Sequence, residues 1–117
     1  MEEAVFRTML FDFYGELLTE KQREYFHLHY NEDMSLAEIA QSEGISRQGV
    51  WDIIRRGEET LRRTEEKTGL VARFRAQRET VAVMEQQLRQ LLPLTEGEAR
   101  LLAESLTEKV QELRHGI

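Results

Sequence analysis

The sequence has no cysteine, a single proline and no long apolar segment among its 117 residues. The lack of cysteine excludes disulfide bonds and metal centres held by thiolates. The longest stretch without Asp, Glu, Lys or Arg is seven residues, from 25 to 31. A membrane-spanning helix needs about 20 apolar residues. The acidic start at Glu2 and Glu3 also differs from the basic start of a secretion signal. We therefore expect a protein that does not span a membrane, and the lack of cysteine is compatible with a reducing cytoplasm.

Basic residues are outnumbered, with 16 Lys and Arg against 22 Asp and Glu, which gives a net charge of −6. The positive charge is concentrated, because residues 47–78 hold 9 basic and 5 acidic side chains and lie between acidic segments. Arginine supplies 13 of the 16 positive charges, and its planar guanidinium suits phosphates and base edges. An alternative interpretation is that the arginines balance glutamates four residues away on solvated helices. The spacing allows three such pairs: Arg55–Glu59, Glu58–Arg62 and Glu59–Arg63.

Helix is predicted along the whole chain, because Leu, Glu, Gln and Arg are abundant and proline is rare. Hydrophobic spacing and capping residues predict helices over about 3–16, 19–30, 35–43, 47–67, 70–91 and from 95 onward. Three capping boxes are expected: Thr19 with Gln22, Ser35 with Glu38 and Thr95 with Glu98. On the first helix, the residues expected to share one apolar face are Phe6, Met9, Leu10, Phe13 and Leu17.

Residues 35–56, SLAEIAQSEGISRQGVWDIIRR, have the pattern of a helix-turn-helix motif. Ala40 is small enough to let two helices approach closely, and Gly44 turns the chain between them. Val50 and Ile54 are spaced to pack the second helix onto the first. One face of the second helix is then free to enter a DNA major groove.

The free face of this second helix carries the predicted contacts to nucleic acid: Ser46, Arg47, Gln48, Trp51, Asp52, Arg55 and Arg56. Arginine suits guanine edges and glutamine suits adenine edges, while the serine and the amides of the helix start can hold a phosphate. Secondary phosphate contacts are predicted for Arg62 and Arg63. Glycines at 49 and 57 count against a stable reading helix, since each costs about 1 kcal/mol relative to alanine.

RNA is the second polyanion that this face suits. The major groove of A-form RNA is too narrow for side chains to read, so recognition would use unpaired bases instead. Trp51, flanked by Arg47 and Arg55, has the composition of a stacking platform, and arginines from Arg62 to Arg78 can follow phosphates. The competing interpretation of Trp51 is an anchor in the core or in a dimer interface.

Several stretches resemble known families. LTEKQREYF and SLAEIAQSEGISRQGV, within residues 18–61, resemble region four of bacterial primary sigma factors. FDFYGELLTEKQ, YNEDMSLAEIA and SRQGVWDIIRR extend the resemblance, over roughly residues 3–92, to the YlxM family of small bacterial helix-turn-helix proteins. That resemblance implies a cytoplasmic accessory or regulatory protein of the signal recognition particle (SRP) pathway. Such a protein would act through the SRP RNA or through the SRP GTPases.

Three functions follow as hypotheses. The first is a non-catalytic protein of the SRP pathway that binds nucleic acid, either SRP RNA or DNA, through the arginine-rich helix. The second is a sequence-specific DNA-binding transcriptional regulator, and the third is an adaptor that binds the SRP GTPases and no nucleic acid. An enzyme is not expected, because no carboxylate pair lies in an apolar setting suited to acid–base catalysis. No cofactor or metal is expected either, since His27 and His29, two apart on a helix, point about 200° away from each other.

We expect an all-α fold in two parts, a sigma region-four-like helix-turn-helix domain at residues 3–68 and a C-terminal helical extension at 69–117. Apolar residues recur at heptad-like positions over 70–91. The last helix carries a similar stripe: Ala99, Leu102, Leu106, Val110, Leu113 and Ile117. These stripes can pack back on the first three helices or pair with a second copy of the chain, and we favour a homodimer that is joined through residues 70–117.

Overall fold

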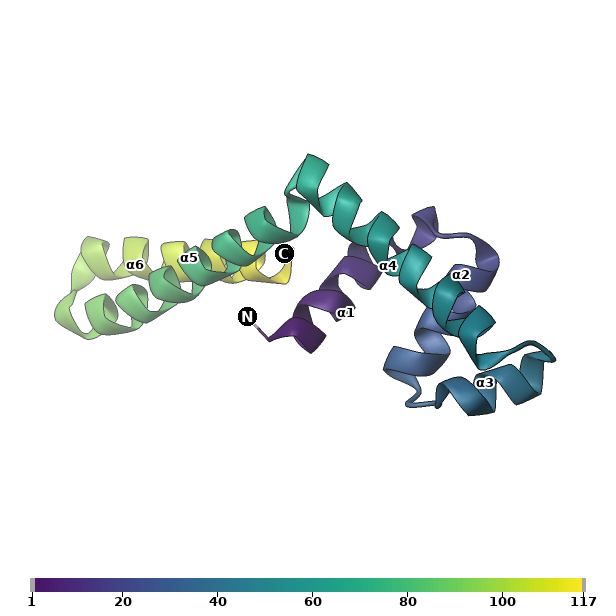
Figure 1. Cartoon of the computed structure of the whole chain (residues 1–117). Coiled ribbons are helices and arrows are strands. Elements are labelled where there is room, and N and C mark those ends of the chain that lie inside the picture. Colours follow the sequence, from purple (N-terminus) through teal and green to yellow (C-terminus); the bar gives the residue numbers. More distant parts are fainter. Residues whose placement is uncertain (1, 117) are drawn as a thin grey trace. The chain divides into compact units, whose positions relative to one another are not determined.

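The computed structural model of the protein describes residues 2–116, which contain helices and no strand. Six α-helices follow one another (Figure 1): α1 (Glu3–Tyr14), α2 (Glu20–Phe26), α3 (Leu36–Glu43), α4 (Arg47–Thr68), α5 (Leu70–Leu91) and α6 (Gly97–His115). The remaining elements are 3-10 turns at Gly15–Leu17 and Leu92–Leu94 and a π-helical turn at His27–Asn31. The predicted all-α fold is confirmed. Over residues 2–116, none of the helices is both long enough and apolar enough to cross a membrane.

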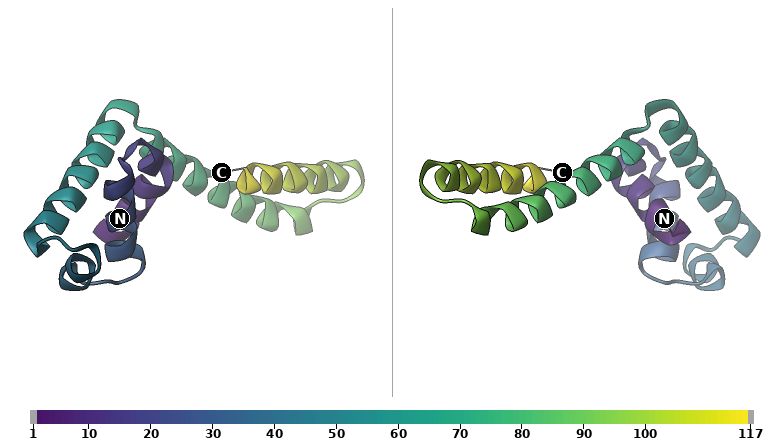
Figure 2. Two further views of the ribbon diagram at one scale, coloured as in Figure 1. Left: turned by 90° about the vertical axis from the view of Figure 1, so that its right-hand side faces the viewer. Right: turned by 90° about the vertical axis from the view of Figure 1, so that its left-hand side faces the viewer.

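The chain forms two compact units, the first ending at Val71 and the second beginning at Ala72. In the first unit, α4 packs against α1, α2 and α3, and the four helices share one hydrophobic core. The largest fully buried side chains of this core are Phe26, Leu10, Ile39, Ile54, Leu61, Val50 and Val71. In the second unit, α5 and α6 run antiparallel side by side as a hairpin (Figure 2). The buried hydrophobic side chains of this hairpin are Val81, Ala103 and Val110.

Two of the three predicted capping boxes are present. Thr19 and Gln22 cap α2, and Ser35 and Glu38 cap α3, each pair with both reciprocal hydrogen bonds. The third prediction is wrong, because α6 starts after Glu96 and has no side-chain cap. The hydroxyl of Thr95 donates instead to the carbonyl of Leu92, at 2.8 Å, and closes the 3-10 turn that follows α5.

The apolar face of α1 also differs from its prediction. Leu10 and Tyr14 are buried, whereas Phe13 is 39% exposed and Leu17 is 63% exposed. The buried positions are four residues apart, so they define the inner stripe of α1. Beyond Tyr14 the chain winds as a 3-10 turn, and its tighter winding takes Leu17 off that stripe.

The stripe predicted for α6 is only partly buried. Val110 is 4% exposed, but Leu102 is 68% exposed and Leu113 is 54% exposed. Ile117, the last member of the predicted stripe, lies outside the described residues. Within its own unit, α6 therefore buries fewer of these side chains than the spacing suggests.

Candidate nucleic-acid interface

The corner between α3 and α4 sets the direction of the candidate reading helix. Gly44 has φ of 71°, in the left-handed region that glycine adopts without strain. The amides of Gly44 and Ile45 both donate to the carbonyl of Ala40, at 2.9 and 3.2 Å. Ala40 is buried, as expected for a close approach of two helices. This glycine-closed corner is the turn of a helix-turn-helix motif.

Packing on α3 leaves the opposite side of α4 in solvent. Val50 and Ile54 are fully buried and face the core, as the sequence predicts. At the start of α4, the Oγ atom of Ser46 accepts a hydrogen bond from the amide of Gly49, at 3.0 Å. A Cβ atom at position 49 would lie 3.2 Å from that oxygen. Glycine therefore leaves room for the capping hydroxyl of Ser46.

The second glycine of α4, Gly57, lies where α2 comes close to α4. It is buried, and a Cβ atom there would lie 3.3 Å from Cβ of Gln22 and 3.6 Å from Cδ1 of Leu18. The sequence suggested that both glycines weaken the helix. The structure shows that Gly57 has a packing role and Gly49 a capping role.

The predicted contact residues lie on the first three turns of α4, with Arg56 about 180° around the helix axis from Arg47. The exposed members are Ser46, Arg47, Gln48, Trp51, Arg55 and Arg56, and Asp52 is partly exposed. Trp51 is 37% exposed and lies outside the buried core cluster. The interpretation of Trp51 as a core anchor therefore does not hold, while stacking on a base or a place in a dimer interface remain predictions.

The charges on this face fall into two groups. Asp52 accepts a hydrogen bond from Nε2 of Gln48 at 3.2 Å and lies 3.8 Å from Nη2 of Arg55. Arg55 also donates to Glu59, at 2.8 Å. Arg47 and Arg56 make no ion pair with any residue between 2 and 116. Their two guanidinium groups are free to meet a ligand anion, whereas that of Arg55 is already balanced.

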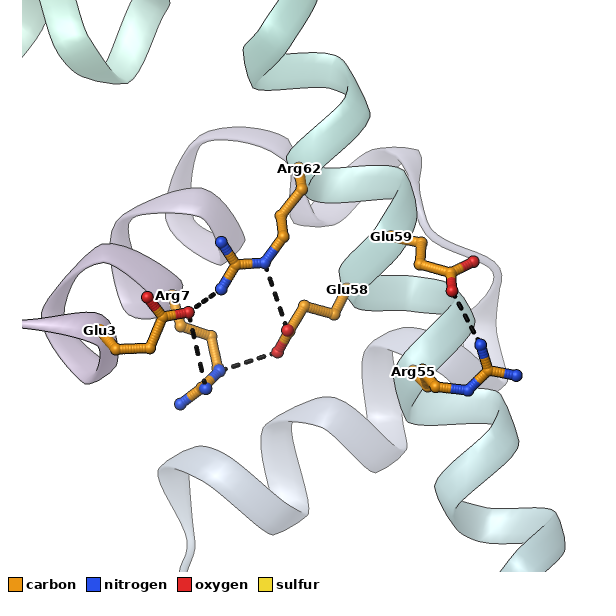
Figure 3. A network of polar contacts seen from close by, with 6 residues as sticks. All are labelled: Glu3, Arg7, Arg55, Glu58, Glu59 and Arg62. Carbon is orange, nitrogen blue, oxygen red and sulfur yellow. Dashed lines mark hydrogen bonds and ion pairs between the residues drawn. The ribbon is translucent and has the colours of Figure 1, made fainter.

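The two predicted secondary contacts have different surroundings. Arg62 belongs to a network of polar contacts between α1 and α4, in which it pairs with Glu3 and Glu58 (Figure 3). Arg7 joins the same network through a 2.8 Å contact from its Nε atom to Glu58. Arg63 is exposed and has no ion pair within the described part of the chain. This arrangement favours a scaffold role for Arg62 and leaves Arg63 available to a phosphate.

The alternative interpretation of the arginines is thus correct for part of α4. The pairs Arg55–Glu59 and Glu58–Arg62 are formed, at 2.8 and 3.3 Å. The third pair allowed by the spacing, Glu59–Arg63, is absent from residues 2–116. Since α4 mixes paired and unpaired cations, sequence spacing alone does not identify the free ones.

A polar clamp that the sequence did not reveal ties α2 to the end of α3. The hydroxyl of Tyr25 donates to Glu43 at 3.0 Å, and Nζ of Lys21 donates to the same oxygen at 3.2 Å. These two hydrogen bonds lower the pKa of the Glu43 carboxyl below its ordinary value. Burial and the hydrogen bond to Glu43 raise the pKa of Tyr25. Such contacts between residues about 20 apart leave no periodic signal in a sequence.

The histidines near the motif take part in local contacts. Nδ1 of His29 is 2.8 Å from the carbonyl oxygen of Met34, and Nε2 of His27 is 3.2 Å from Glu32. Among residues 2–116, no group of three or more His, Cys, Asp or Glu side chains is placed to hold a metal ion.

A short capped helix, a glycine-closed corner and a longer helix with an exposed polar face define a helix-turn-helix protein. The family model of UPF0122, described as "Putative helix-turn-helix protein, YlxM / p13 like", matches residues 1–98. The chain belongs to this family.

Relatives with the same family name occur in several bacteria. The chain is 53% identical to a UPF0122 protein of Thermoanaerobacter sp. strain X514 over 72 residues, and this alignment covers 62% of each chain. It is 43% identical over 108 residues to a UPF0122 protein of Halalkalibacterium halodurans, which covers 91% of this chain and 95% of the relative. The match spans about three fifths of the length of several of the curated relatives, including that of Caldanaerobacter subterraneus at 60%.

Proposed function

We propose that the protein is a non-catalytic accessory or regulatory protein of the bacterial SRP pathway that binds nucleic acid through the first three turns of α4. The observation that carries the proposal is the partly exposed Trp51 on the same three turns of α4 as the unpaired guanidinium groups of Arg47 and Arg56. The resemblance to the YlxM family supports the SRP pathway and a place in the cytoplasm. SRP RNA and DNA are the two candidate nucleic acids, and the SRP GTPases are candidate protein partners.

The chemistry of this face suits an unpaired stretch of RNA. An indole ring offers a stacking surface to any base, which contributes about 1–3 kcal/mol per base. Arg47, one turn before Trp51, supplies a planar fork for a neighbouring phosphate, and Arg56 supplies a second fork on the other side of α4. Asp52 is engaged by Gln48 and Arg55, so its negative charge is partly balanced where the polyanion would lie.

The second candidate function is a DNA-binding transcriptional regulator. The intact corner at Gly44 and the buried pair Val50 and Ile54 support it, because they present α4 as a reading helix for a major groove. A third candidate, an adaptor to the SRP GTPases, needs no nucleic acid. It would use the same exposed face of α4.

Intrinsic fluorescence distinguishes these functions, because Trp51 is the only tryptophan in the chain. The protein is titrated with SRP RNA, with a duplex DNA pool and with an SRP GTPase, each at two salt concentrations. Stacking quenches the indole on RNA, and Trp51→Ala is expected to weaken RNA binding about 5- to 150-fold. Quenching by duplex DNA alone favours the regulator, and salt-insensitive binding to the GTPase alone favours the adaptor.

Arginine variants give the matched control. Arg56→Gln should flatten the dependence of log affinity on log salt by about one unit, because one phosphate contact is lost. Arg55→Gln removes the same charge, but from a guanidinium that already pairs with Glu59, so a smaller change is expected. Equal slopes for wild type, Arg55→Gln and Arg56→Gln would contradict the proposed interface.

The proposal includes a homodimer joined through residues 69–117. Several large apolar side chains of the hairpin remain in solvent: Met84, Leu91, Leu101, Leu102, Leu106 and Leu113. A two-helix unit with so few buried side chains gains stability from a second copy. Sedimentation at tens of micromolar should give a dimer, and Leu106→Glu should shift it towards monomer. A monomeric wild-type protein would contradict this part of the proposal.

A further inference from the structure

The two sides of the α5–α6 hairpin differ in chemistry. One side carries a groove lined mostly by apolar and uncharged groups, among them Ala76, Thr80, Met84 and Leu113, together with Arg73. The other side carries a hollow of about 270 Å³. The residues that line this hollow are Arg78, Val81, Ala82, Glu85, Arg89 and Arg114. We call it the arginine hollow.

The arginine hollow has an excess of positive charge. Three guanidinium groups and one carboxylate line it, and that carboxylate, Glu85, pairs with Arg114 at 3.4 Å. Arg78 lies over the ring of Phe74, with its guanidinium carbon 5.6 Å from the ring centre. Neither Arg78 nor Arg89 has an ion-pair partner within residues 2–116. Two cations of the hollow are therefore unbalanced.

The acidic residues of α6 do not offset this charge within the hollow. α6 carries four glutamates, Glu98, Glu104, Glu108 and Glu112, and none of them lines the hollow. The last three follow one another at spacings of four residues, so they form a separate stripe on α6. The helix thus keeps its negative charge apart from the three arginines.

We propose that the arginine hollow binds phosphate groups of a nucleic acid backbone and is a second contact surface besides α4. Arg78 and Arg89 are 11 residues apart, which corresponds to about 16 Å along a helix. A duplex strand carries one phosphate per about 3.4 Å of axis, so the row of arginines spans several phosphates. Guanidinium groups bind phosphate oxygens in pairs of hydrogen bonds, without reading sequence. This inference rests on the proposed function, because both surfaces take the same polyanion.

The test compares two double variants of the full chain that lose the same charge. Arg78→Gln with Arg89→Gln removes the unbalanced cations of the hollow. Arg100→Gln with Lys109→Gln removes two cations of α6 that do not line it. Each protein is titrated with an RNA hairpin and with a DNA duplex of equal length at several salt concentrations, and circular dichroism checks that each variant is helical. Since all four substituted side chains are exposed, both variants are expected to fold.

The hollow variant is expected to flatten the salt dependence by about one to two units and to weaken binding roughly tenfold near physiological salt. The control variant should keep the wild-type slope. Equal slopes for the two variants, whether both unchanged or both flattened, would overturn the inference. The two nucleic acids separate the sources of phosphate, because a slope change on only one of them identifies which backbone the hollow accepts.

The Trp51→Ala variant makes failure of the two proposals distinguishable. If it binds as wild type while the hollow variant does not, the proposed interface on α4 is wrong and the hollow is a contact surface on its own. If it loses binding while the hollow variant does not, the further inference is wrong and the proposed function stands. A wild-type protein that binds neither nucleic acid overturns both.

Discussion

The close contact at Gly57 gives a sharp test of how α2 and α4 pack. A methyl group added there would lie 3.3 Å from Cβ of Gln22, whereas carbon atoms attract best at about 3.5–4.0 Å. Gly57→Ala therefore requires the two helices to separate by a few tenths of an ångström. That cost is of the order of 1 kcal/mol, which matches the roughly 1 kcal/mol gained by replacing glycine with alanine inside a helix. We expect the unfolding free energy of Gly57→Ala to lie within about 1 kcal/mol of wild type.

A larger side chain cannot be absorbed in the same way. The neighbouring atoms are the Cβ and Cγ of Gln22 and Cδ1 of Leu18, and Cβ of Gln22 is held by the backbone of α2. The side-chain amide of Gln22 is also committed, because its oxygen accepts from the amide of Thr19 in the capping box. Gly57→Leu is expected to destabilise the first unit by about 2–4 kcal/mol through overpacking and loss of the cap.

Urea denaturation followed by the Trp51 fluorescence measures both variants. Ala37→Leu is the matched control, because Ala37 is an exposed helical residue of the same unit and the change should alter stability by less than about 0.5 kcal/mol. If Gly57→Leu is as stable as Gly57→Ala, the close approach of α2 and α4 is wrong. If Gly57→Ala alone costs more than about 3 kcal/mol, the helices have no freedom to separate and the compensation argued above fails.

Two further predictions concern the cap of α4 and the clamp at the end of α3. Ser46→Ala should lower the unfolding free energy measured in urea by about 1 kcal/mol, since the amide of Gly49 loses its acceptor. The control is Ser42→Ala at an exposed position of α3. If Ser46→Ala costs no more than this control, the cap does not stabilise α4. The lowered pKa of Glu43 means that its carboxylate stabilises the fold at pH values above the ordinary glutamate pKa. This contribution is lost as the pH falls through the lower pKa that Glu43 has in the folded state. The stability difference between wild type and Glu43→Gln, measured from pH 7 to pH 3, should therefore shrink in acid, and a difference independent of pH would refute the linkage.

The sequence was sufficient where the structure depends on local signals. The corner at Gly44 and the capping boxes at Thr19 and Ser35 follow from residues three to five positions apart, and all are present. The capping box predicted at Thr95 does not form, because the hydroxyl of Thr95 donates to the carbonyl of Leu92, one turn earlier. A capping pattern after proline thus does not distinguish the start of a helix from the end of the previous turn.

Long-range pairing explains what the sequence did not show about the candidate interface. Arg62 and Arg63 are adjacent and looked equivalent, but only Arg62 reaches Glu3, which is 59 positions away on α1. Which cation of α4 is free depends on which side of the helix the core covers. For the same reason, the packing role of Gly57 became visible only once α2 was in place.

The position of the free cations reconciles an acidic protein with the polyanionic ligand that we propose. A net charge of −6 repels nucleic acid at long range, but at physiological salt the Debye length is about 8 Å, so distant acidic groups are screened. Guanidinium groups in direct contact with phosphates are not screened in this way. Arg47 and Arg56 on α4 and the pair in the arginine hollow can therefore bind while the acidic remainder suppresses indiscriminate association. At lower salt concentration the Debye length is longer, so the acidic groups repel the nucleic acid from a greater distance. This repulsion limits the gain in affinity at very low ionic strength.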